Sequence, residues 1–386
     1  MFSQPEPSSL SQLLQQLAQS AAQPAQQACT MPPAVYTSEA FLALEQEAIF
    51  RSEWVCLGHA GEVAQPGDYF SSEVAGEPLL VVRGDDGQVR VLSNVCRHRA
   101  NLIAQGRGNR QRLVCSYHAW SYDRSGRLLH APLMEDATAR NGARCDLPAF
   151  ATELWQDFIF VNLDGQAAPL GPRLAAFLPA INNYAITDRH HQFVGHEVWR
   201  TNWKCLVENF MEGYHLSAAH AKTLHAITPT ALCRKIAAPP GMTAYTAGYA
   251  PTVPERGPYP PALSAQEQRY SVLFSVFPNL MVSVAPNVTL YLLVQPVDAD
   301  HVAIHWGLVG SIADPQHPDV IRYRELCESF NLEDRIQLEA VQKGLKSRHY
   351  HGGPLAPSDF EGTVWDFHQY IAQRMGTTQQ AGSRHV

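Results

Sequence analysis

The sequence of 386 residues lacks several features that mark common classes of protein. It contains no run of lysine and arginine and carries a net charge of -7, so nucleic acid is not expected as its main partner. No apolar stretch approaches the roughly 18 residues that a membrane-spanning helix needs, so we expect no membrane segment. The N-terminus lacks the basic start and long apolar segment of a secretory signal, and a cytoplasmic location is therefore the expectation.

Two further absences narrow the function. No internal repeat is visible, and no G-x-G-x-x-G motif follows a predicted strand, so we do not expect the chain to bind a nicotinamide cofactor itself. Six of the eight cysteines are scattered without the close spacing of a small disulfide-bonded domain, which indicates reduced thiols. Hydrophobic residues make up 45% of the chain, which is enough for a sizeable core.

The first part of the chain predicts a lead-in followed by a small β domain. Residues 1–35 are rich in Gln, Ala, Ser and Pro and are expected to form a short helix around Leu10 to Leu17, followed by a flexible lead-in. Residues 37–54 predict a helix with Ser38 as its N-cap. Short strands with turn residues follow, among them a hairpin at Asp86-Gly87. We therefore place a first domain, all-β apart from its N-terminal helix, at residues 36–165.

The remaining residues, 166–386, mix long strands with helices, so the chain as a whole is assigned to the α+β class. A long helix is predicted from about Pro318 to Leu345. Eight prolines fall between Pro229 and Pro261, both included, and this segment is expected to be a long irregular loop.

The two remaining cysteines each have a histidine at a short offset. Cys96 and His98 are separated by one residue, and Cys115 and His118 by two. Two such pairs on two loops of the β domain can hold one metal site. A structural zinc ion is one alternative, although zinc sites usually pair Cys with Cys and His with His. One Cys and one His on each loop suits a two-iron cluster in which one iron takes both thiolates and the other both imidazoles.

The pattern Cys96-Arg-His98, followed after sixteen residues by Cys115-Ser-Tyr-His118, resembles the Rieske [2Fe-2S] motif. By this resemblance Cys96 and Cys115 bind one iron of the cluster, and His98 and His118 bind the other. Rieske domains occur in respiratory complexes, small ferredoxins and oxygenases, so the rest of the chain has to decide among these systems.

The segment NWKCLVENFMEGYHLSAAH, residues 202–220, gathers groups that suit a second metal. Within thirteen residues it contains two acids, one amide and two imidazoles, namely Glu208, Asn209, Glu212, His215 and His220. Two histidines near a carboxylate can begin a facial triad on iron(II), which leaves the opposite face open for dioxygen and substrate. The alternative is an ordinary helix with surface histidines.

The spacing of the two histidines does not suit a regular helix. His215 and His220 are five residues apart, which would turn their side chains about 140° from each other. We therefore expect the helix to lose regularity between Leu216 and Ala219, for example in a π-bulge. Glu212 lies three residues before His215 and is expected to share its face.

The segment is similar to the mononuclear-iron segment of Rieske non-haem iron oxygenase α subunits, in which Asn-Trp-Lys opens the helix and two histidines follow. The resemblance extends from about Tyr36 to Arg374. It implies a Rieske domain at residues 36–165 and a larger catalytic domain at residues 166–386, built as an antiparallel sheet covered by helices.

The resemblance also implies a ligand set for a mononuclear iron(II). His215 and His220 are two of the ligands, and the third is a distant carboxylate. The segment EDRIQLEAVQKGLKS matches that region, so Asp334 is the expected third ligand, with Glu333 and Glu339 as alternatives.

Two further residues are expected to be catalytic by the same resemblance, Asn209 and Glu212. Glu212 is not expected to bind the iron. One of its oxygens is expected to accept a hydrogen bond from His215, and the other to reach His118 of a neighbouring subunit, because α subunits of this family assemble head to tail as homotrimers. Electrons are expected from NAD(P)H through a separate flavin or iron–sulfur reductase.

The expected reaction is an O2-dependent hydroxylation or oxidative demethylation, and two features favour a quaternary ammonium substrate such as glycine betaine or carnitine. Glu212 stands where ring dioxygenases usually have Asp, and the run from Asp334 to Trp365 looks like the betaine and carnitine branch. Candidates for an aromatic box around the cation are Phe210, Phe274, Phe277, Tyr291 and Trp365.

Two alternatives stay open. An aromatic-ring hydroxylating oxygenase acting on an aromatic carboxylate would need an Arg or Lys in its pocket, and no single residue stands out for that role. A metal-binding electron-transfer or scaffold protein would need no second metal.

Overall fold

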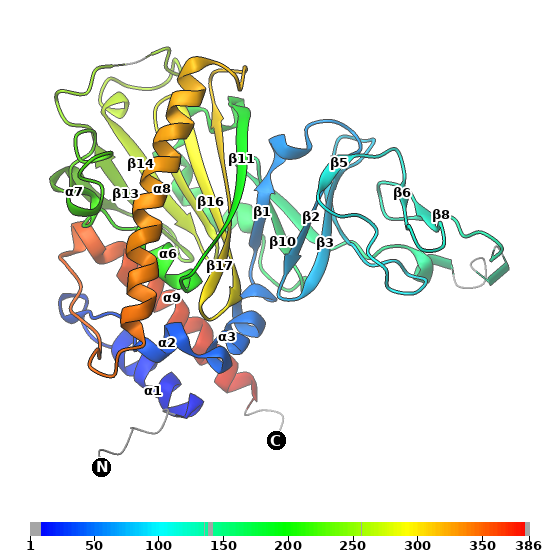
Figure 1. Ribbon diagram of the computed structural model, residues 1–386, viewed down its shortest axis with the longest axis horizontal. Coiled ribbons are helices and arrows are strands. Elements are labelled where there is room, and N and C mark those ends of the chain that lie inside the picture. The colour runs from blue at the N-terminus through cyan, green and yellow to red at the C-terminus, as the bar shows by residue number, and fades with distance from the viewer. Residues whose placement is uncertain (1–8, 135, 138–141, 256, 383–386) are drawn as a thin grey trace. The chain divides into compact units, whose positions relative to one another are not determined.

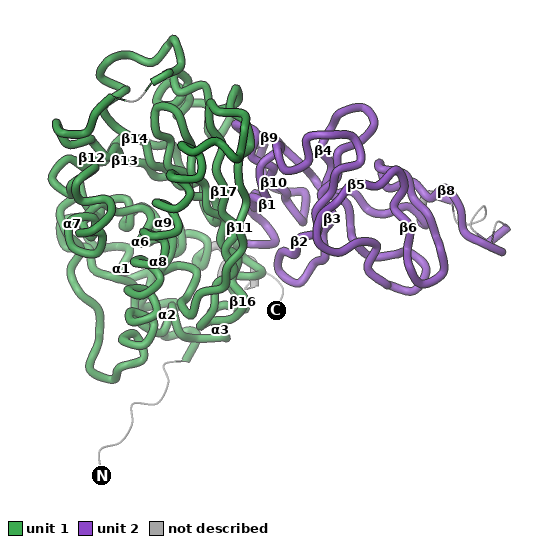
Figure 2. Tube along the Cα trace, turned by 45° about the horizontal axis from the view of Figure 1, so that its top comes forward, with its two compact units in different colours: residues 1–49, 172–386 green, residues 50–171 purple. Residues whose placement is uncertain are grey.

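The computed structural model describes residues 9–134, 136–137, 142–255 and 257–382. The chain forms two compact units, one of residues 50–171 and one of residues 1–49 together with 172–386, shown in purple and green in Figure 2. Within the described ranges no helix is both long and apolar enough to cross a membrane.

The unit of residues 50–171 is built from three small antiparallel sheets, with strand orders β1-β10-β9, β4-β3-β2-β5 and β6-β7-β8. Its strands are β1 (Val55–His59), β2 (Asp68–Val74), β3 (Glu77–Arg83), β4 (Val89–Ser93), β5 (Arg107–Asn109), β6 (Leu113–Val114), β7 (Ser121–Tyr122), β8 (Leu128–His130), β9 (Ala151–Trp155) and β10 (Phe158–Asn162). The predicted hairpin at Asp86-Gly87 is confirmed: it joins β3 to β4, and Gly87 takes the left-handed conformation with φ 76°.

The larger unit is organised around one seven-stranded antiparallel sheet in the order β11-β17-β16-β15-β14-β13-β12. Its strands are β11 (His190–Trp199), β12 (Cys233–Ile236), β13 (Met242–Gly248), β14 (Tyr270–Val276), β15 (Leu280–Val284), β16 (Val288–Asp298) and β17 (His301–Gly310). The middle strands are almost wholly buried, since six consecutive residues of β16 from Thr289 to Val294 belong to the core.

Helices make up much of the remaining described residues, and some of them contact this sheet. They are α1 (Leu10–Ala21), α2 (Pro33–Thr37), α3 (Glu39–Glu45), α5 (Leu170–Leu174), which contains the boundary between the units, α6 (Trp203–Phe210), α7 (Leu216–Ala219), α8 (Pro318–Leu345) and α9 (Ser358–Gly382). In Figure 1, α8 (orange) runs in front of the strands. α6 contacts β16 and β17, α8 contacts β11, and α9 contacts β12 and β13. The helix predicted from Pro318 to Leu345 is confirmed.

Short helical turns complete the chain. They are η1 (Ala25–Gln27), the π-helical η2 (Gln46–Phe50), η3 (Ala60–Val63), η4 (Gly142–Cys145), η5 (Ala175–Ala180), η6 (Asn182–Tyr184), η7 (Ile186–Asp188), η8 (Thr230–Leu232) and η9 (Glu267–Arg269).

The short helix expected in the N-terminal segment is confirmed as α1, but the described part of this segment is packed against the rest of the chain. The part of residues 1–35 that is described contains α1, which begins with a capping box between Ser9 and Gln12 and buries Leu13 and Leu17 where it packs against α9. Ser38 caps α3 as predicted, but that helix ends at Glu45. The described residues before residue 50 belong to the same compact unit as the second half of the chain, so the all-β unit begins at residue 50, and not at residue 36.

The proline-rich segment was also predicted wrongly in part. Residues 229–261 contain β12 and β13, which form one edge of the large sheet, and not only an irregular loop. The prolines fall outside these strands, at Pro239 and Pro240 between them and at positions before and after them. Proline lies outside the interiors of these two strands because it lacks the N–H that strand pairing needs.

Candidate metal centres

Each Cys-His pair lies on a loop of the all-β unit. Residues 96–101 follow β4, and residues 115–120 join β6 to β7. In both loops the backbone N–H of the fifth residue, Ala100 or Ala119, donates to the carbonyl oxygen of the cysteine at 3.1 Å. Both alanines have left-handed backbone, with φ 58° and 57°. The two loops are therefore two copies of one turn, which presents the side chains of each pair.

The loops bring the four ligand candidates together. Cys96 and Cys115 are buried, and their thiols are close enough to share a hydrogen bond. The ring centroids of His98 and His118 are 4.5 Å apart, and His98 stacks on Trp120. Nδ1 of His98 is buried and has no hydrogen-bond partner among the described residues. Two thiols beside two imidazoles, one with an unpaired buried nitrogen, fit a two-iron cluster.

Two residues that the spacing did not reveal contact these thiols. The Tyr122 hydroxyl lies 3.4 Å from Cys96 Sγ, and the Asn101 amide donates to Cys115 Sγ at 3.6 Å. Burial raises the pKa of the Cys96 thiol. Burial acts in the same direction at Cys115, but backbone N–H groups and the Asn101 amide outweigh it and lower that pKa. Hydrogen bonds to the sulfurs are one means by which a protein sets a cluster's potential.

The second group of candidates lies where α6 gives way to α7. α6 begins after Asn202, whose side chain accepts from the backbone N–H of Lys204 at 3.1 Å. The chain then leaves the helix at Met211, and His215 and His220 stand at the two ends of the one-turn α7. The expected loss of helical regularity is present, but its position was wrong. Residues 216–219 are regular, and the chain departs from the helix before and after them.

Three side-chain atoms converge at this point. Nε2 of His215 and Nε2 of His220 are 3.2 Å apart, and Asp334 Oδ1, from α8, lies 3.6 Å from the first and 3.1 Å from the second. Metal–ligand bonds of about 2.1 Å that meet at right angles place neighbouring ligand atoms about 3 Å apart. The triangle of two imidazoles and one carboxylate therefore fits one face of an octahedral iron(II) site.

A second carboxylate stands behind each imidazole. Glu212 Oε1 contacts Nδ1 of His215, and Glu333 Oε2 lies 2.8 Å from Nδ1 of His220. His220 is 1% exposed. Burial by itself lowers the pKa of His220, but the Asp334 and Glu333 carboxylates outweigh burial and raise it. Glu333, one of the alternatives for the third ligand, is thus on the far side of the ring from the three converging atoms.

Two other candidates from the sequence, Asn209 and Glu339, have different contacts relative to the three converging atoms. The Asn209 amide donates to Asp334 Oδ1 at 3.1 Å, so it contacts the converging carboxylate directly. Glu339, the second alternative for the third ligand, pairs with Arg335 at 2.9 Å instead.

The aromatic candidates are not gathered into one box. Phe274 and Tyr291 are fully buried in the sheet, and Phe277 packs against Phe367 and Tyr370. The remaining two candidates, Phe210 and Trp365, are partly buried. A substrate cage made of these five residues is therefore not supported by their packing.

Buried contacts to distant segments fix α6. Lys204 Nζ lies 2.9 Å from each carboxylate oxygen of Glu45 in α3, and neither side chain is exposed. Four residues later on α6, Glu208 accepts from Tyr36 at 2.7 Å and lies 3.0 Å from His368 Nε2 of α9. α6, the helix that leads to the converging imidazoles, is therefore held by contacts to residues from both the N-terminal and the C-terminal part of the chain.

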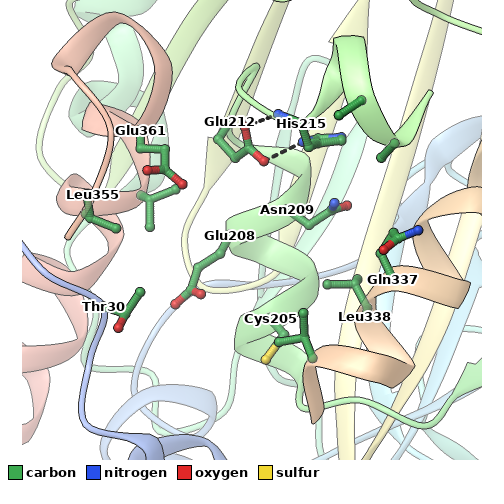
Figure 3. Close-up of a pocket in the computed structure, with 14 residues that line it drawn as sticks. Thr30, Cys205, Glu208, Asn209, Glu212, His215, Gln337, Leu338, Leu355 and Glu361 are labelled. Atoms are coloured by element: carbon green, nitrogen blue, oxygen red, sulfur yellow. Dashed lines mark hydrogen bonds and ion pairs between the residues drawn. The ribbon is translucent and has the colours of Figure 1, made fainter. Parts of the chain in front are cut away.

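A cavity of about 520 Å³ opens beside α6 on the side of Glu212 (Figure 3). It is lined by Thr30, Cys205, Glu208, Asn209, Glu212, His215, Ala218, Ala219, Gln337, Leu338, Val341, Leu355, Glu361 and Val364. Figure 3 shows Glu212 directed at His215. The lining includes three carboxylates and no Lys or Arg, so a positively charged group is the complementary occupant.

Two family models match the chain, one in each half. The model of the Rieske [2Fe-2S] domain matches residues 53–150, and that of the ring hydroxylating alpha subunit (catalytic domain) matches residues 186–377. The chain belongs to the Rieske non-haem iron oxygenase α subunits. A [2Fe-2S] cluster and a mononuclear iron are accordingly the cofactors of this oxygenase, as predicted, and the zinc and scaffold alternatives fall away.

Relatives of the oxygenase carry names for quaternary ammonium substrates. The carnitine monooxygenase oxygenase subunit of Acinetobacter baumannii is 28% identical over 333 residues, which is 84% of this chain and 87% of the relative. The glycine betaine monooxygenase oxygenase subunit of Chromohalobacter salexigens is 33% identical over 199 residues, 51% of this chain and 44% of the relative. The crystal structure of the quaternary ammonium Rieske monooxygenase CntA in complex with its substrate L-carnitine superposes with a TM-score of 0.80, at 26% identity, covering 93% of this chain and 98% of that one.

The contacts that hold the oxygenase's candidate ligands were only partly foreseen. Three contacting residues were not singled out in the sequence, namely Tyr122, Asn101 and Thr223. The Thr223 hydroxyl donates to Glu333 at 2.6 Å. None has a diagnostic spacing from the residue that it contacts. The one usable signal was Glu333 itself, an acid directly before the expected ligand Asp334.

Proposed function

We propose that this terminal oxygenase hydroxylates a small quaternary ammonium compound at a carbon next to the charged nitrogen. In this proposal the cluster is held by Cys96, Cys115, His98 and His118, and the iron by His215, His220 and Asp334. The observation that carries the proposal is the convergence of two imidazole nitrogens and one carboxylate oxygen in a chain whose relatives are named for carnitine and glycine betaine.

The reaction can be written in balance. The substrate C–H group, O2, two electrons and two protons give a hydroxylated carbon and water. A carbon that carries both a hydroxyl group and a quaternary nitrogen loses the nitrogen, which yields a tertiary amine, a carbonyl compound and a proton. When bound, the iron supplies the site for dioxygen, and the cluster supplies electrons one at a time.

The chain's own residues keep the site in order. Glu212 and Glu333 hold the two imidazoles so that both Nε2 atoms face Asp334, and Asn209 orients the Asp334 carboxylate through its amide. Such outer contacts fix ring orientation and the position of the ring proton.

The electron donor is proposed to be a separate NAD(P)H-dependent reductase, as the name oxygenase subunit in the relatives implies a second component. We also propose a cytoplasmic location, which suits a chain in which none of the eight cysteines forms a disulfide bond.

We further propose that the oxygenase works as a homotrimer. In this trimer the unit of residues 50–171, the Rieske unit, of one copy reaches Glu212 of the next. Glu212 lines the cavity, and it contacts the His215 nitrogen that does not face the triad. A donor that enters this cavity would therefore meet Glu212 together with the His215 ring that Glu212 contacts.

The surface around the cluster is complementary to that cavity. Arg97 and Arg99 are exposed on either side of His98, whereas Glu208 and Glu361 line the cavity beside Glu212. Exposed apolar side chains accompany both surfaces, namely Leu102 and Tyr117 on the unit of residues 50–171 and Val341, which lines the cavity, on α8.

The substrate class is tested by oxygen uptake. The oxygenase, a suitable reductase and NAD(P)H are mixed with a panel of quaternary amines and aromatic carboxylates, and products are identified by mass spectrometry. We expect substrate-dependent uptake with a tertiary amine as product. Uptake confined to aromatic carboxylates would refute the proposed substrate class.

The iron site is tested by substitution. His215→Ala and Asp334→Ala should each lose the third iron of the chain and all oxygenation, while the visible spectrum of the Rieske cluster survives. Glu339→Gln is the matched control on α8, because Glu339 pairs with Arg335, and it should keep full iron content. Full iron occupancy in Asp334→Ala would place the third ligand elsewhere.

The role of Glu212 is tested in a single turnover. Glu212→Gln should keep both metal centres and substrate binding, yet its reduced cluster should reoxidise far more slowly after mixing with oxygen and substrate. Glu325→Gln, an exposed acid on α8, serves as the charge-matched control. Reoxidation of Glu212→Gln at the parent rate would exclude this residue from the electron path.

A further inference from the structure

The buried imidazole of His220 is contacted at both of its nitrogens by neighbouring residues of one helix. Asp334 Oδ1 lies 3.1 Å from Nε2, and Glu333 Oε2 lies 2.8 Å from Nδ1. Thr223 donates its hydroxyl to the same Glu333 oxygen at 2.6 Å. We propose that Glu333, held by Thr223, is a positioning residue that sets the orientation and proton position of His220 and so determines the affinity of the triad for iron(II).

This inference rests on the proposed iron site. A nitrogen that binds a metal carries no proton, so with Nε2 of His220 in the triad the ring proton must be at Nδ1. At 1% exposure, His220 has no access to bulk water for that proton. Glu333 supplies the acceptor, and without it the N–H would be buried and unpaired, or the ring would turn or change its tautomer.

The helix makes this arrangement possible. Consecutive side chains on α8 diverge by about 100°, so Glu333 and Asp334 can reach around one ring from two sides. For the same reason Glu333 is not placed to bind the metal, because its carboxylate contacts the nitrogen that faces away from the triad.

The carboxylates behind the two imidazoles differ in origin. Glu212 comes from the same loop as His215, three residues earlier, and lines the cavity. Glu333 comes from a separate helix, and it is not among the residues that line the cavity. Thr223 lies after α7, in the segment that carries His220. Its hydrogen bond to Glu333 therefore also connects this segment with α8, the helix that carries Asp334. Its effect should therefore be on the assembly of the triad and not on the approach of a donor.

The experiment measures iron(II) affinity directly. Holoprotein is stripped of its mononuclear iron under anaerobic conditions with the cluster retained, and iron(II) is returned in competition with a chelator. We expect Glu333→Ala to weaken iron(II) binding by about 10–100-fold, the usual effect of losing such a contact. Glu333→Gln should lose only a few-fold, because the amide oxygen still accepts from Nδ1–H. The electron paramagnetic resonance spectrum of the nitric oxide adduct of the iron(II) should change in Glu333→Ala and be restored in Glu333→Gln.

Controls separate the possible outcomes. Asp334→Ala must lose iron in the same titration, and if it does not, the proposed iron site fails and with it this inference. If Asp334→Ala loses iron but Glu333→Ala binds as the parent does, only the present inference is overturned. If both Glu333 variants lose iron as completely as Asp334→Ala, Glu333 is a ligand and the inference is again overturned.

Two further variants complete the test. Glu325→Gln removes an exposed charge from the same helix and should leave iron(II) affinity unchanged. Thr223→Val should weaken binding in the parent but add nothing in Glu333→Ala, because Thr223 acts through Glu333. An equal effect of Thr223→Val in both backgrounds would exclude Thr223 from the arrangement. Melting temperature and the Rieske spectrum report whether each variant is folded.

Discussion

The buried ion pair between Lys204 and Glu45 offers a sharp test of how α6, the helix that leads to His215 and His220, is held. Both side chains are fully buried, with Lys204 Nζ 2.9 Å from each Glu45 oxygen, and the Trp203 indole also donates to Glu45 at 3.0 Å. Lys204→Met keeps the length of the side chain but leaves a buried carboxylate without its counter-charge. Removing one partner of such a pair costs about 3–5 kcal/mol. For a unit of this size we expect a melting temperature lower by roughly 6–20 °C.

The loss should depend on pH in a defined direction. Burial raises the pKa of Glu45, and Lys204 opposes this, so removal of Lys204 raises the pKa further. An acid whose pKa is higher in the folded state costs nothing below its unfolded pKa of about 4.3, and it destabilises the fold increasingly as pH rises toward the folded pKa. The difference in stability between Lys204→Met and the parent should therefore be smaller at pH 5 than at pH 8.

Urea unfolding followed by circular dichroism measures both effects, and the visible band of the Rieske unit serves as an internal control. The double variant Glu45→Gln with Lys204→Met retains an oxygen acceptor for the Trp203 indole and removes the unpaired charge. We expect it to be more stable than Lys204→Met alone although it carries one substitution more. A loss below about 1 kcal/mol in Lys204→Met, or a double variant that is less stable still, would refute this reasoning.

Three other outcomes are expected. Ala100→Gly or Ala119→Gly should stabilise the Rieske unit by about 0.5–1 kcal/mol in thermal unfolding, because both alanines have left-handed backbone. Tyr122→Phe should lower the reduction potential of the cluster in voltammetry, because the reduced cluster loses the hydroxyl 3.4 Å from Cys96 Sγ; an unchanged potential would mean that this hydroxyl does not tune the cluster. Leu17→Ala should cost about 2–5 kcal/mol of unfolding free energy, because Leu17 is 1% exposed where α1 meets α9, whereas a loose N-terminal helix would show no loss.

The sequence by itself determined what is encoded within a few residues. The Cys-His pairs are visible because each pair lies on one loop, where a shared cluster would fix the spacing. Ser38 was recognisable as a cap, and Asp86-Gly87 as a hairpin turn, because both act on backbone groups two or three residues away. The long helix from Pro318 to Leu345 was predictable because its signals accumulate over many turns.

The family resemblance pointed to Asp334 among the acids of α8, but only the tertiary structure shows which acid meets the imidazoles. Glu333, Asp334 and Glu339 lie within seven residues of one another. Their spacing along the chain does not show which of them faces His215 and His220. The packing of α8 against α7 turns Asp334 to the Nε2 atoms and Glu333 to the opposite side of His220. The N-terminal segment is a similar case, because its short amphipathic helix has too little surface to be ordered by itself and becomes fixed only against α9. In both cases the deciding contacts join residues more than a hundred positions apart, where local sequence carries no information about geometry.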